Sequence, residues 1–547
     1  MGHNGERQSN LSQTSILKDD SYIKFFLNCT RASSTIQNGV HIRQNFVDYS
    51  AFLKHCSEEQ WGNILPDHVY GIDSSHIEQP LDSNTGHSRR FLSELMLIST
   101  VSEVDIDMAK LKSVTQQYIS TGTFAPQTLV QASNALSFNF WYNGANLTPN
   151  NIADESKRNP KNGFKVACRD ALKKPDAEMH NPNVPAGVVK GRKVSDQAKQ
   201  HKQQDFRLLD AFYEIIRTIK NNPALFDKNI PEFELLPYLG DSSVITTANA
   251  PYCLLKPLCC PNKSCTDRKA VAQVVESLDQ YSAEEVFCPI CGAAVCEWDC
   301  IGLTEQFESE MSNLGLLSDL TYVLEHLRAT QRLLCLPPAP HNTAIIMDGT
   351  LGLFRKLQAL TPGIKAIVER TLNNGSTVFG VVKHSETKDF FDYLDHPLDP
   401  TQQIPCGSFW LVRNTERYKY ISPRFHAKDP HGAHTHYGVD VMVKTLKGYR
   451  FLVSVALPSS VEQSTGLEYG TDAYLDYVEH NFHSIPSFVK MLATLEKVQM
   501  LLYGGSTIPQ TLTHGQASIS WNVSGRILAQ AIVNERIKNN TTPVKKG

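Results

Sequence analysis

Two aspartates follow short apolar runs that have the composition of buried strands. Asp73 comes after HVYGI and Asp348 comes after TAIIM, and each run is typical of a strand that ends at its acid. Small residues follow both acids, so a ligand can approach closely. A carboxylate at the end of a buried strand is costly unless it is paired or bound to a metal. If folding brings the two together, Mg²⁺ or Mn²⁺ would relieve their repulsion, polarise a phosphodiester and activate water; the alternative is that each Asp only forms a turn.

Cysteines are concentrated in one part of the chain. Seven of the thirteen fall between positions 259 and 300, and clustering of this kind in a chain without a secretory signal indicates metal binding rather than disulfides. The run CPICG offers two thiolates from a tight turn, and CCPNKSC upstream offers a second pair. We therefore predict a structural Zn²⁺ site that resembles a zinc ribbon. The predicted ligands are Cys260, Cys265, Cys288 and Cys291, and the alternatives are Cys259, Cys296 and Cys300.

Positive charge is also local. The whole chain has a net charge of −3, but the stretch Lys157–Lys202 holds twelve Lys/Arg against four Asp/Glu, a net of +8. Such a stretch can neutralise DNA phosphates, and a solvated surface insertion is an equal alternative. Later arginines can hold phosphates in bidentate fashion or form surface ion pairs. The predicted DNA ligands are Lys190, Arg192, Lys193, Arg413 and Arg450.

A loop with four histidines, RFHAKDPHGAHTHYGVD, invites a metal interpretation as well. Histidines in a loop can bind zinc adventitiously, but we expect a solvated loop here, because no strand-end carboxylate spacing supports a dedicated site. Asp440, on the strand that follows, is a minor candidate ligand.

Composition limits the class of protein. The 547 residues are 41% apolar and 20% charged, which is ordinary for a soluble globular protein of about three domains. No apolar run of about 18 residues and no secretory signal occur, so we predict a cytoplasmic protein with no membrane association. A phosphate-binding loop of the G-x-x-x-x-G-K-[ST] type is missing as well, so we expect no ATP hydrolysis by this chain.

Hydrophobic periodicity places these motifs on an α/β framework. Apolar residues at three- and four-residue spacing predict helices over 205–222 and 316–334, whereas low-apolar, Asn- and Pro-rich segments predict loops within 143–202. Strands and helices interleave over 340–540, which favours a mixed sheet covered by helices. The segment 68–81 is predicted to hold a strand that ends in a polar turn at Asp73, and 337–351 a loop leading into a strand that ends at Asp348. Further strands are predicted at 91–106, 377–385, 408–414 and 438–458, and further helices near 353–373, 471–500 and 514–537.

The order of the motifs resembles the NurA family, nucleases with an RNase H-like fold that work with HerA-type hexameric ATPases. In that family the first Asp, a Glu on a helix before the second Asp, the second Asp and a late His gather around manganese. The resemblance therefore implies a catalytic site of Asp73, Glu325, Asp348 and His514, with the three carboxylates holding Mn²⁺ or Mg²⁺. The matching segments are GIDSS, IIMDGTL, TVFGVVKHS, the strand pair around YKYISPRFH and YRFLVSVALP, and IPQTLTHGQASIS.

Two parts of this assignment stay open. Glu325 is the least certain carboxylate, with Glu308 and Glu310 as substitutes. Lys383, in VVKHS, would steady the scissile phosphate or the attacking hydroxide, or else would be a strand lysine that points its tip into solvent.

The resemblance implies a DNA nuclease, exo- and/or endonucleolytic, that forms a homodimer and docks on a HerA-like hexameric ATPase. Its roles would be DNA-end processing in repair or defence against phage DNA. The alternative is a catalytically inactive nucleic-acid-binding or scaffold protein that uses the basic stretch and the zinc ribbon. The expected units are an N-terminal tail with helices (1–66), a first part of the nuclease core (67–106), a basic helical insertion (107–252), the zinc-ribbon module (253–302) and a second part of the core (303–547).

Overall fold

A computed structural model describes most of the elements that carry the predicted site. The described residues are 42–54, 63–80, 95–111, 154–157, 159–173, 208–222, 260–271, 286–304, 314–336, 342–373, 375–395, 403–422, 430–499 and 507–517, with a few shorter pieces. The predictions for the tail 1–41 and the last helix beyond 517 lie outside these residues, as do those for Cys259, Lys190, Glu308, Glu310 and His426.

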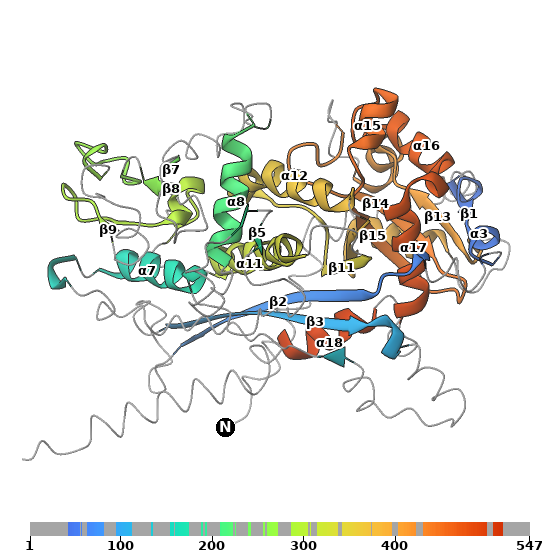
Figure 1. The fold of residues 1–547 in the computed structure, drawn as a ribbon, viewed down its shortest axis with the longest axis horizontal. Helices are drawn as coiled ribbons and strands as arrows, with labels where there is room; N and C mark the ends of the chain where they lie inside the picture. Colours follow the sequence, from blue (N-terminus) through green and yellow to red (C-terminus); the bar gives the residue numbers. More distant parts are fainter. Residues whose placement is uncertain are drawn as a thin grey trace, which may run out of the picture.

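A mixed sheet of nine strands forms the centre of the described part of the chain (Figure 1). Its strand order is β1-β13-β14-β15-β12-β11-β2-β3-β4. Strands β2, β11 and β12 are parallel neighbours, and the other neighbouring pairs are antiparallel. The strands are β1 (Val47–Asp48), β2 (His68–Pro80), β3 (Leu95–Asp107), β4 (Ser133–Asn134), β11 (Thr343–Asp348), β12 (Thr377–Val382), β13 (Ser408–Leu411), β14 (Val439–Lys444) and β15 (Arg450–Val455).

Helices cover both faces of this sheet, and the mixed α/β class is confirmed. Alternate residues of each strand face opposite sides, and two separate hydrophobic clusters result. One cluster packs the sheet against α8, α11 and α12, and the other packs it against α16 and α17. The helices are α3 (Ser50–Lys54), α7 (Pro160–Lys173), α8 (Leu208–Lys220), α11 (Leu314–Cys335), α12 (Thr361–Leu372), α13 (Glu386–Leu394), α14 (Asn414–Glu416), α15 (Ser460–Thr465), α16 (Asp472–His480), α17 (Pro486–Val498) and α18 (Ile508–Ala517).

Three short hairpins complete the described elements. They are β5 (Val188–Val189) with β6 (Arg192–Lys193), β7 (Leu239–Asp241) with β8 (Leu255–Pro257), and β9 (Val286–Phe287) with β10 (Ala294–Val295). Figure 1 shows α7 and β7–β9 at one end of the molecule and β1 and β13 at the other. Among the described helices none is long and apolar enough to cross a membrane. The RNase H-like topology and the domain bounds stay predictions.

The predicted strand end at Asp73 is wrong. β2 continues through Asp73 to Pro80, paired with β3 along its whole length. The parallel neighbour β11, in contrast, ends at Asp348, so the last part of β2 belongs to a two-stranded ribbon. Because a ribbon of this kind packs against little hydrophobic core, it accepts polar residues such as the segment SSH. In the sequence, the same polar residues look like a turn.

Two further predictions need correction. Helix α7 lies inside the stretch where we predict loops; its Asn- and Lys-rich composition hides an apolar stripe that includes Phe164, Cys168 and Leu172, all buried. The helix that carries His514 begins at Ile508 rather than near 514, with Pro509 in its first turn, a position that proline favours; the rest of the predicted helix 514–537 lies outside the described residues. By contrast, the predicted helices over 205–222 and 316–334 and the strand ending at Asp348 are confirmed.

Candidate metal-dependent active site

Asp73 and Asp348 lie side by side on one face of the sheet. β11 runs parallel to β2, with Met347 opposite Ile72, and the two acids are the next residue of each strand. Because side chains alternate along a strand, both carboxylates leave the sheet on the face away from α11. Asp73 is buried and Asp348 is partly exposed. The convergence of these two acids therefore follows directly from strand register.

Helix α18 brings two more polar side chains to these acids. His514 Nδ1 lies 3.0 Å from Asp73 Oδ2. One helical turn earlier, Gln510 Nε2 donates to Asp348 Oδ1 at 3.2 Å. The helix lies on the β2–β3 pair opposite α11 (Figure 1), so it closes the site from the face where the aspartates point.

Gly71 allows α18 to approach the sheet this closely. A Cβ atom at Gly71 would lie 2.6 Å from Pro509 Cβ and 3.0 Å from its carbonyl carbon, well inside van der Waals contact. The helix is also tied to the neighbouring strand, because Ser102 Oγ donates to the Thr513 carbonyl at 2.7 Å. The close contact of α18 with β2 and its bond to β3 therefore fix the position of His514.

Glu325 reaches the site from the opposite face. It lies on α11 and is buried, and its Oε2 accepts a hydrogen bond of 2.6 Å from Ser74 Oγ. Ser74 is the residue after Asp73 and faces α11. Glu325 is therefore linked through Ser74 to the residue after Asp73, at the level where β11 has ended. The other oxygen, Glu325 Oε1, is buried and has no hydrogen-bond partner among the described residues.

A buried ion-pair group fixes α11 against the sheet. Glu103 on β3 accepts hydrogen bonds from Arg328 Nε and Arg332 Nε, both at 2.6 Å. All three side chains are almost fully buried, and breaking such a group leaves an uncompensated charge, which costs about 3–5 kcal/mol. Since Arg328 is one turn from Glu325, this group sets the rotation of α11 that directs Glu325 toward Ser74.

The turn after Asp348 depends on two glycines. Gly349 has φ +90°, and its N–H donates to the Val381 carbonyl at 3.0 Å. A Cβ at Gly380 would lie 2.0 Å from the Gly349 oxygen, so no other residue fits there. The turn therefore lies flat over β12. Lys383, just after β12, then places its Nζ 3.0 Å from Asp348 Oδ1 and Oδ2.

Burial and mutual repulsion disfavour the ionised forms of two acids in the site, Glu325 and Asp348. Burial, followed by the charges of Asp73 and Asp348, raises the pKa of Glu325 well above its usual value. Burial and the Asp73 charge likewise raise the pKa of Asp348, with Lys383 acting against them. The hydrogen bond to Asp73 raises the pKa of His514. A divalent cation bound between such acids would favour their ionised forms and offset the repulsion between their negative charges.

The donor set suits a hard cation. One ligand atom from each of Asp73, Asp348 and His514 lies within 4.8 Å of the others, and Glu325 adds a buried oxygen that lacks a partner. Carboxylate oxygens with one imidazole fit Mn²⁺ or Mg²⁺ better than softer metals. Three of the four residues implied by the family resemblance, Asp73, Asp348 and His514, are thus brought together. Glu325 is joined to Ser74 next to them, and Lys383 contacts Asp348.

The second predicted metal group is also assembled. One sulfur from each of the four cysteines lies within 4.8 Å of the others, and the Sγ–Sγ distances are 3.6 Å for Cys260–Cys291 and 3.7 Å for Cys265–Cys288. Gly292, at φ +67°, closes the CPICG turn. The alternative ligand Cys296 is buried elsewhere, against Thr304. The geometry fits a closed tetrahedral site for Zn²⁺.

Helix α7 holds this hairpin through one side-chain amide. Asn162 Nδ2 donates to the Gly292 carbonyl at 2.9 Å, and its Oδ1 accepts from the Ala294 N–H at 2.8 Å. The amide donates to one backbone group of the hairpin and accepts from another, as a neighbouring β-strand would. These two hydrogen bonds fix the CPICG turn relative to α7.

Part of the basic stretch is used inside the protein. Lys165 Nζ lies 2.9 Å from Asp299 and Arg169 Nε lies 3.3 Å from Glu297, and all four side chains are buried. The acids belong to a 3₁₀ helix (Glu297–Ile301) that follows the cysteines. These two cations therefore join α7 to the cysteine module and do not face solvent, so the +8 charge overstates what a phosphate backbone would meet.

The arginines predicted to bind DNA form internal ion pairs. Arg413 contacts Asp476 at 2.5 Å and Glu479 at 3.2 Å. Arg450 contacts Asp392 at 3.3 Å, and its Nη1 donates to the Asp395 carbonyl at 3.0 Å. Their donors pair with acids of the same chain, which matches the alternative of surface ion pairs; a role in DNA binding stays a prediction. Arg192 and Lys193 lie in β6, and their role in DNA binding stays a prediction.

Sequence reasoning missed two residues of the site. Gln510 holds Asp348, and its own position is fixed by bonds to the Val381 carbonyl and to Thr507. Ser74 donates a hydrogen bond to Glu325. From the sequence, Ser74 was considered only as a small residue that lets a ligand approach Asp73. The one available signal for Gln510 was its four-residue spacing from His514, which places both on one helix face.

Comparison with known proteins adds little. No family model matches the chain, and no curated protein does. One solved structure, a crystal structure of NurA, aligns over 92% of this chain and 96% of that chain, with 11% sequence identity and a TM-score of 0.22. Such a low TM-score does not establish a shared fold, so the chemistry of the site rests on its own residues.

Proposed function

We propose that the chain is a metal-dependent nuclease that hydrolyses DNA phosphodiester bonds. The observation that carries the proposal is the convergence of Asp73, Asp348 and His514 from three separate segments, with Glu325 joined to the neighbouring Ser74 from the other face of the sheet. Glu325 has an unpartnered buried oxygen, and its pKa is raised by burial and by its acidic neighbours. Mn²⁺ or Mg²⁺ would supply the missing partner.

Each side chain has a distinct role in this proposal. A bound cation supplies polarisation of the scissile phosphate and a lower pKa for a coordinated water. Asp73, Glu325 and Asp348 would hold the ion. His514, whose side chain is 61% exposed, would keep a proton on its ring, through its bond to Asp73, and pass it to the leaving oxygen. Lys383 would balance the charge of Asp348 and steady the phosphate.

The wider setting of the proposal comes from the motif order that resembles NurA. We propose a homodimer that acts with a HerA-like hexameric ATPase, because the sequence has no phosphate-binding loop of its own. The substrate would be DNA ends, cut exo- and/or endonucleolytically, in repair or in defence against phage, inside the cytoplasm. The four cysteines would hold structural Zn²⁺ that stabilises the module next to α7.

A cleavage assay with single-residue variants tests the proposal. End-labelled linear DNA is incubated with the full chain and Mn²⁺, and wild type is compared with Asp73→Asn, Glu325→Gln and Asp348→Asn. Each substitution keeps the size of the side chain and removes one negative charge, so we expect at least a hundredfold loss of cutting with DNA binding retained.

The matched control is Asp476→Asn, a half-exposed surface acid that pairs with Arg413. This variant should cut like wild type. If all three site variants cut as fast as Asp476→Asn, the nuclease assignment is wrong. If none of the proteins cuts but all bind DNA, the chain is a nucleic-acid-binding scaffold instead.

A further inference from the structure

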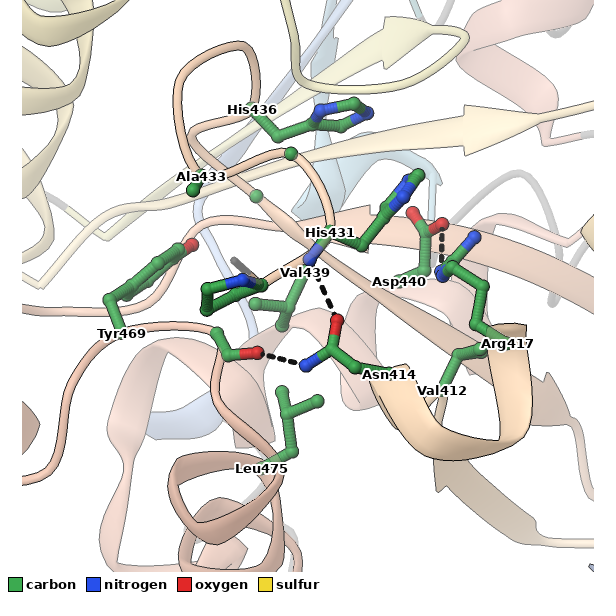
Figure 2. A pocket seen from close by; sticks show the side chains of 14 residues that line it. Val412, Asn414, Arg417, His431, Ala433, His436, Val439, Asp440, Tyr469 and Leu475 are labelled. Carbon is green, nitrogen blue, oxygen red and sulfur yellow. Dashed lines mark hydrogen bonds and ion pairs between the residues drawn. The ribbon is translucent and has the colours of Figure 1, made fainter. Parts of the chain in front are cut away.

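The histidine loop forms a small pocket that the proposed nuclease site does not use. Loop 430–438 lies against the start of β14 and the residues after β13, as Figure 2 shows. The rings of His431 and His436 and the carboxylate of Asp440 surround the same opening, with Arg417 beside the carboxylate. The free volume is about 30 Å³, which holds an ion with a water or two.

We infer that this pocket binds one divalent transition-metal cation, such as Zn²⁺, through His431, His436 and Asp440. Two imidazoles and a carboxylate are a common donor set for such ions. The inference goes beyond the proposed nuclease, because it concerns a separate metal and depends on neither catalysis nor DNA.

The spacing of the two imidazoles fits a shared ion. Their ring centroids lie 5.1 Å apart. With a metal–nitrogen distance of about 2.0–2.1 Å and tetrahedral angles, two imidazoles on one ion have centroids about 5 Å apart. His431, His436 and Asp440 are not among the described groups whose ligand atoms all lie within 4.8 Å of one another. The exposed His431 would therefore have to rotate its side chain to complete the site.

The remaining atoms of these ligands are already oriented by neighbours. Arg417 Nη2 donates to Asp440 Oδ2 at 2.7 Å, whereas Asp440 Oδ1 is buried and has no hydrogen-bond partner among the described residues. His436 Nδ1 lies 2.7 Å from Thr435 Oγ1, which leaves Nε2 for a metal. Outer hydrogen bonds of this kind orient ligands in metal sites. Arg417 already balances the charge of Asp440, so a metal would use the unpartnered Oδ1 as a ligand atom.

A metal here would stabilise the loop that follows Asp348. Leu353 N–H donates to the Thr435 carbonyl at 2.7 Å, and Tyr437 N–H donates to the Leu351 carbonyl at 2.9 Å. Residues 349–354 therefore share backbone hydrogen bonds with the histidine loop. We expect an ion held by this loop to reduce the motion of the turn next to Asp348.

Residue-resolved modification of histidines tests the inference on the wild-type chain. Metal-free protein is treated with diethyl pyrocarbonate with and without Zn²⁺, and each histidine is followed by peptide mass spectrometry. His431 and His434 are both exposed in the same loop, but only His431 lines the pocket. We expect Zn²⁺ to slow modification of His431 at least tenfold and to leave His434 unchanged; equal rates at His431 with and without Zn²⁺ would overturn the inference.

Metal stoichiometry gives a second, independent readout. The His436→Ala variant should bind one Zn²⁺ per chain fewer than wild type, and the matched His434→Ala variant should bind the same amount as wild type. The cysteine and carboxylate groups are intact in all three proteins, so they cancel in the comparison. Identical Zn²⁺ stoichiometry in the two variants, whether at the wild-type level or below it, would refute the site.

Discussion

Replacing Gly71 with alanine would test whether direct contact with β2 positions helix α18. The new Cβ would lie 2.6 Å from Pro509 Cβ, and carbon atoms in contact need about 3.5–4.0 Å. The helix must therefore shift by about 1 Å. A shift of that size would lengthen the 3.0 Å contact between His514 and Asp73 to about 4 Å, beyond hydrogen-bonding range.

The expected effect on catalysis is larger than the effect on folding. A misplacement of about 1 Å costs roughly a hundredfold in rate, whereas overpacking of this kind costs about 1–3 kcal/mol of stability. We expect kcat for Mn²⁺-dependent DNA cleavage to fall about a hundredfold in Gly71→Ala, while the folded chain persists at 25 °C. Cleavage kinetics and thermal denaturation measure the two effects separately.

The control is Gly315→Ala on α11. A Cβ at Gly315 meets no atom within 4 Å, and alanine is the better helix former by about 1 kcal/mol. This variant should be as stable as wild type or more so, with unchanged cleavage. If Gly71→Ala keeps both the wild-type rate and the wild-type melting temperature, the contact does not position α18 and the reasoning fails.

Three further predictions concern charge and metal. Since the pKa of Glu325 is raised by burial and by neighbouring acids, its ionised form destabilises the folded chain as pH rises above the usual carboxyl range. Glu325→Gln should therefore raise the melting temperature of the metal-free chain at pH 7. The variant should also lose the stabilisation of about 2.7 kcal/mol that Mn²⁺ at 100 times its Kd gives wild type. Because the bond to Asp73 raises the pKa of His514, cleavage by the protonated ring should decline as pH rises through that pKa; His514→Ala should be slower and lack this alkaline limb, and a limb retained in the variant would assign it elsewhere. Finally, Cys288→Ser should lose one Zn²⁺ per chain and expose the module to limited proteolysis, whereas the exposed Cys406→Ser should do neither.

The sequence predicted the elements whose signal is periodic or compositional. The helix carrying Glu325 and the strand ending at Asp348 were both found, because an apolar stripe and a short apolar run are local patterns. The cysteine ligands were found for the same reason, through their density and the CPICG turn. Fold class and metal candidates are therefore accessible without coordinates.

The remainder depends on contacts between distant segments. No local pattern shows that β2 passes Asp73 and continues to Pro80, because that depends on pairing with β3. The pairing of Arg413 with acids on α16 is equally invisible in the sequence. Gln510 was missed because its role is to hold a residue 162 positions away. Such roles come from register and helix placement, which only the folded chain defines.

The position of α18 has a consequence for the order in which the protein matures. Among the described strands of the sheet, β15 comes last in the chain and ends at Val455, so a growing polypeptide can complete these strands while Gln510 and His514 are still unsynthesised. Until α18 docks, Asp73 and Asp348 lack the two side chains that orient them. Competence for hydrolysis would thus be acquired late in synthesis, and chains released before α18 would be folded at their centre yet unable to cut.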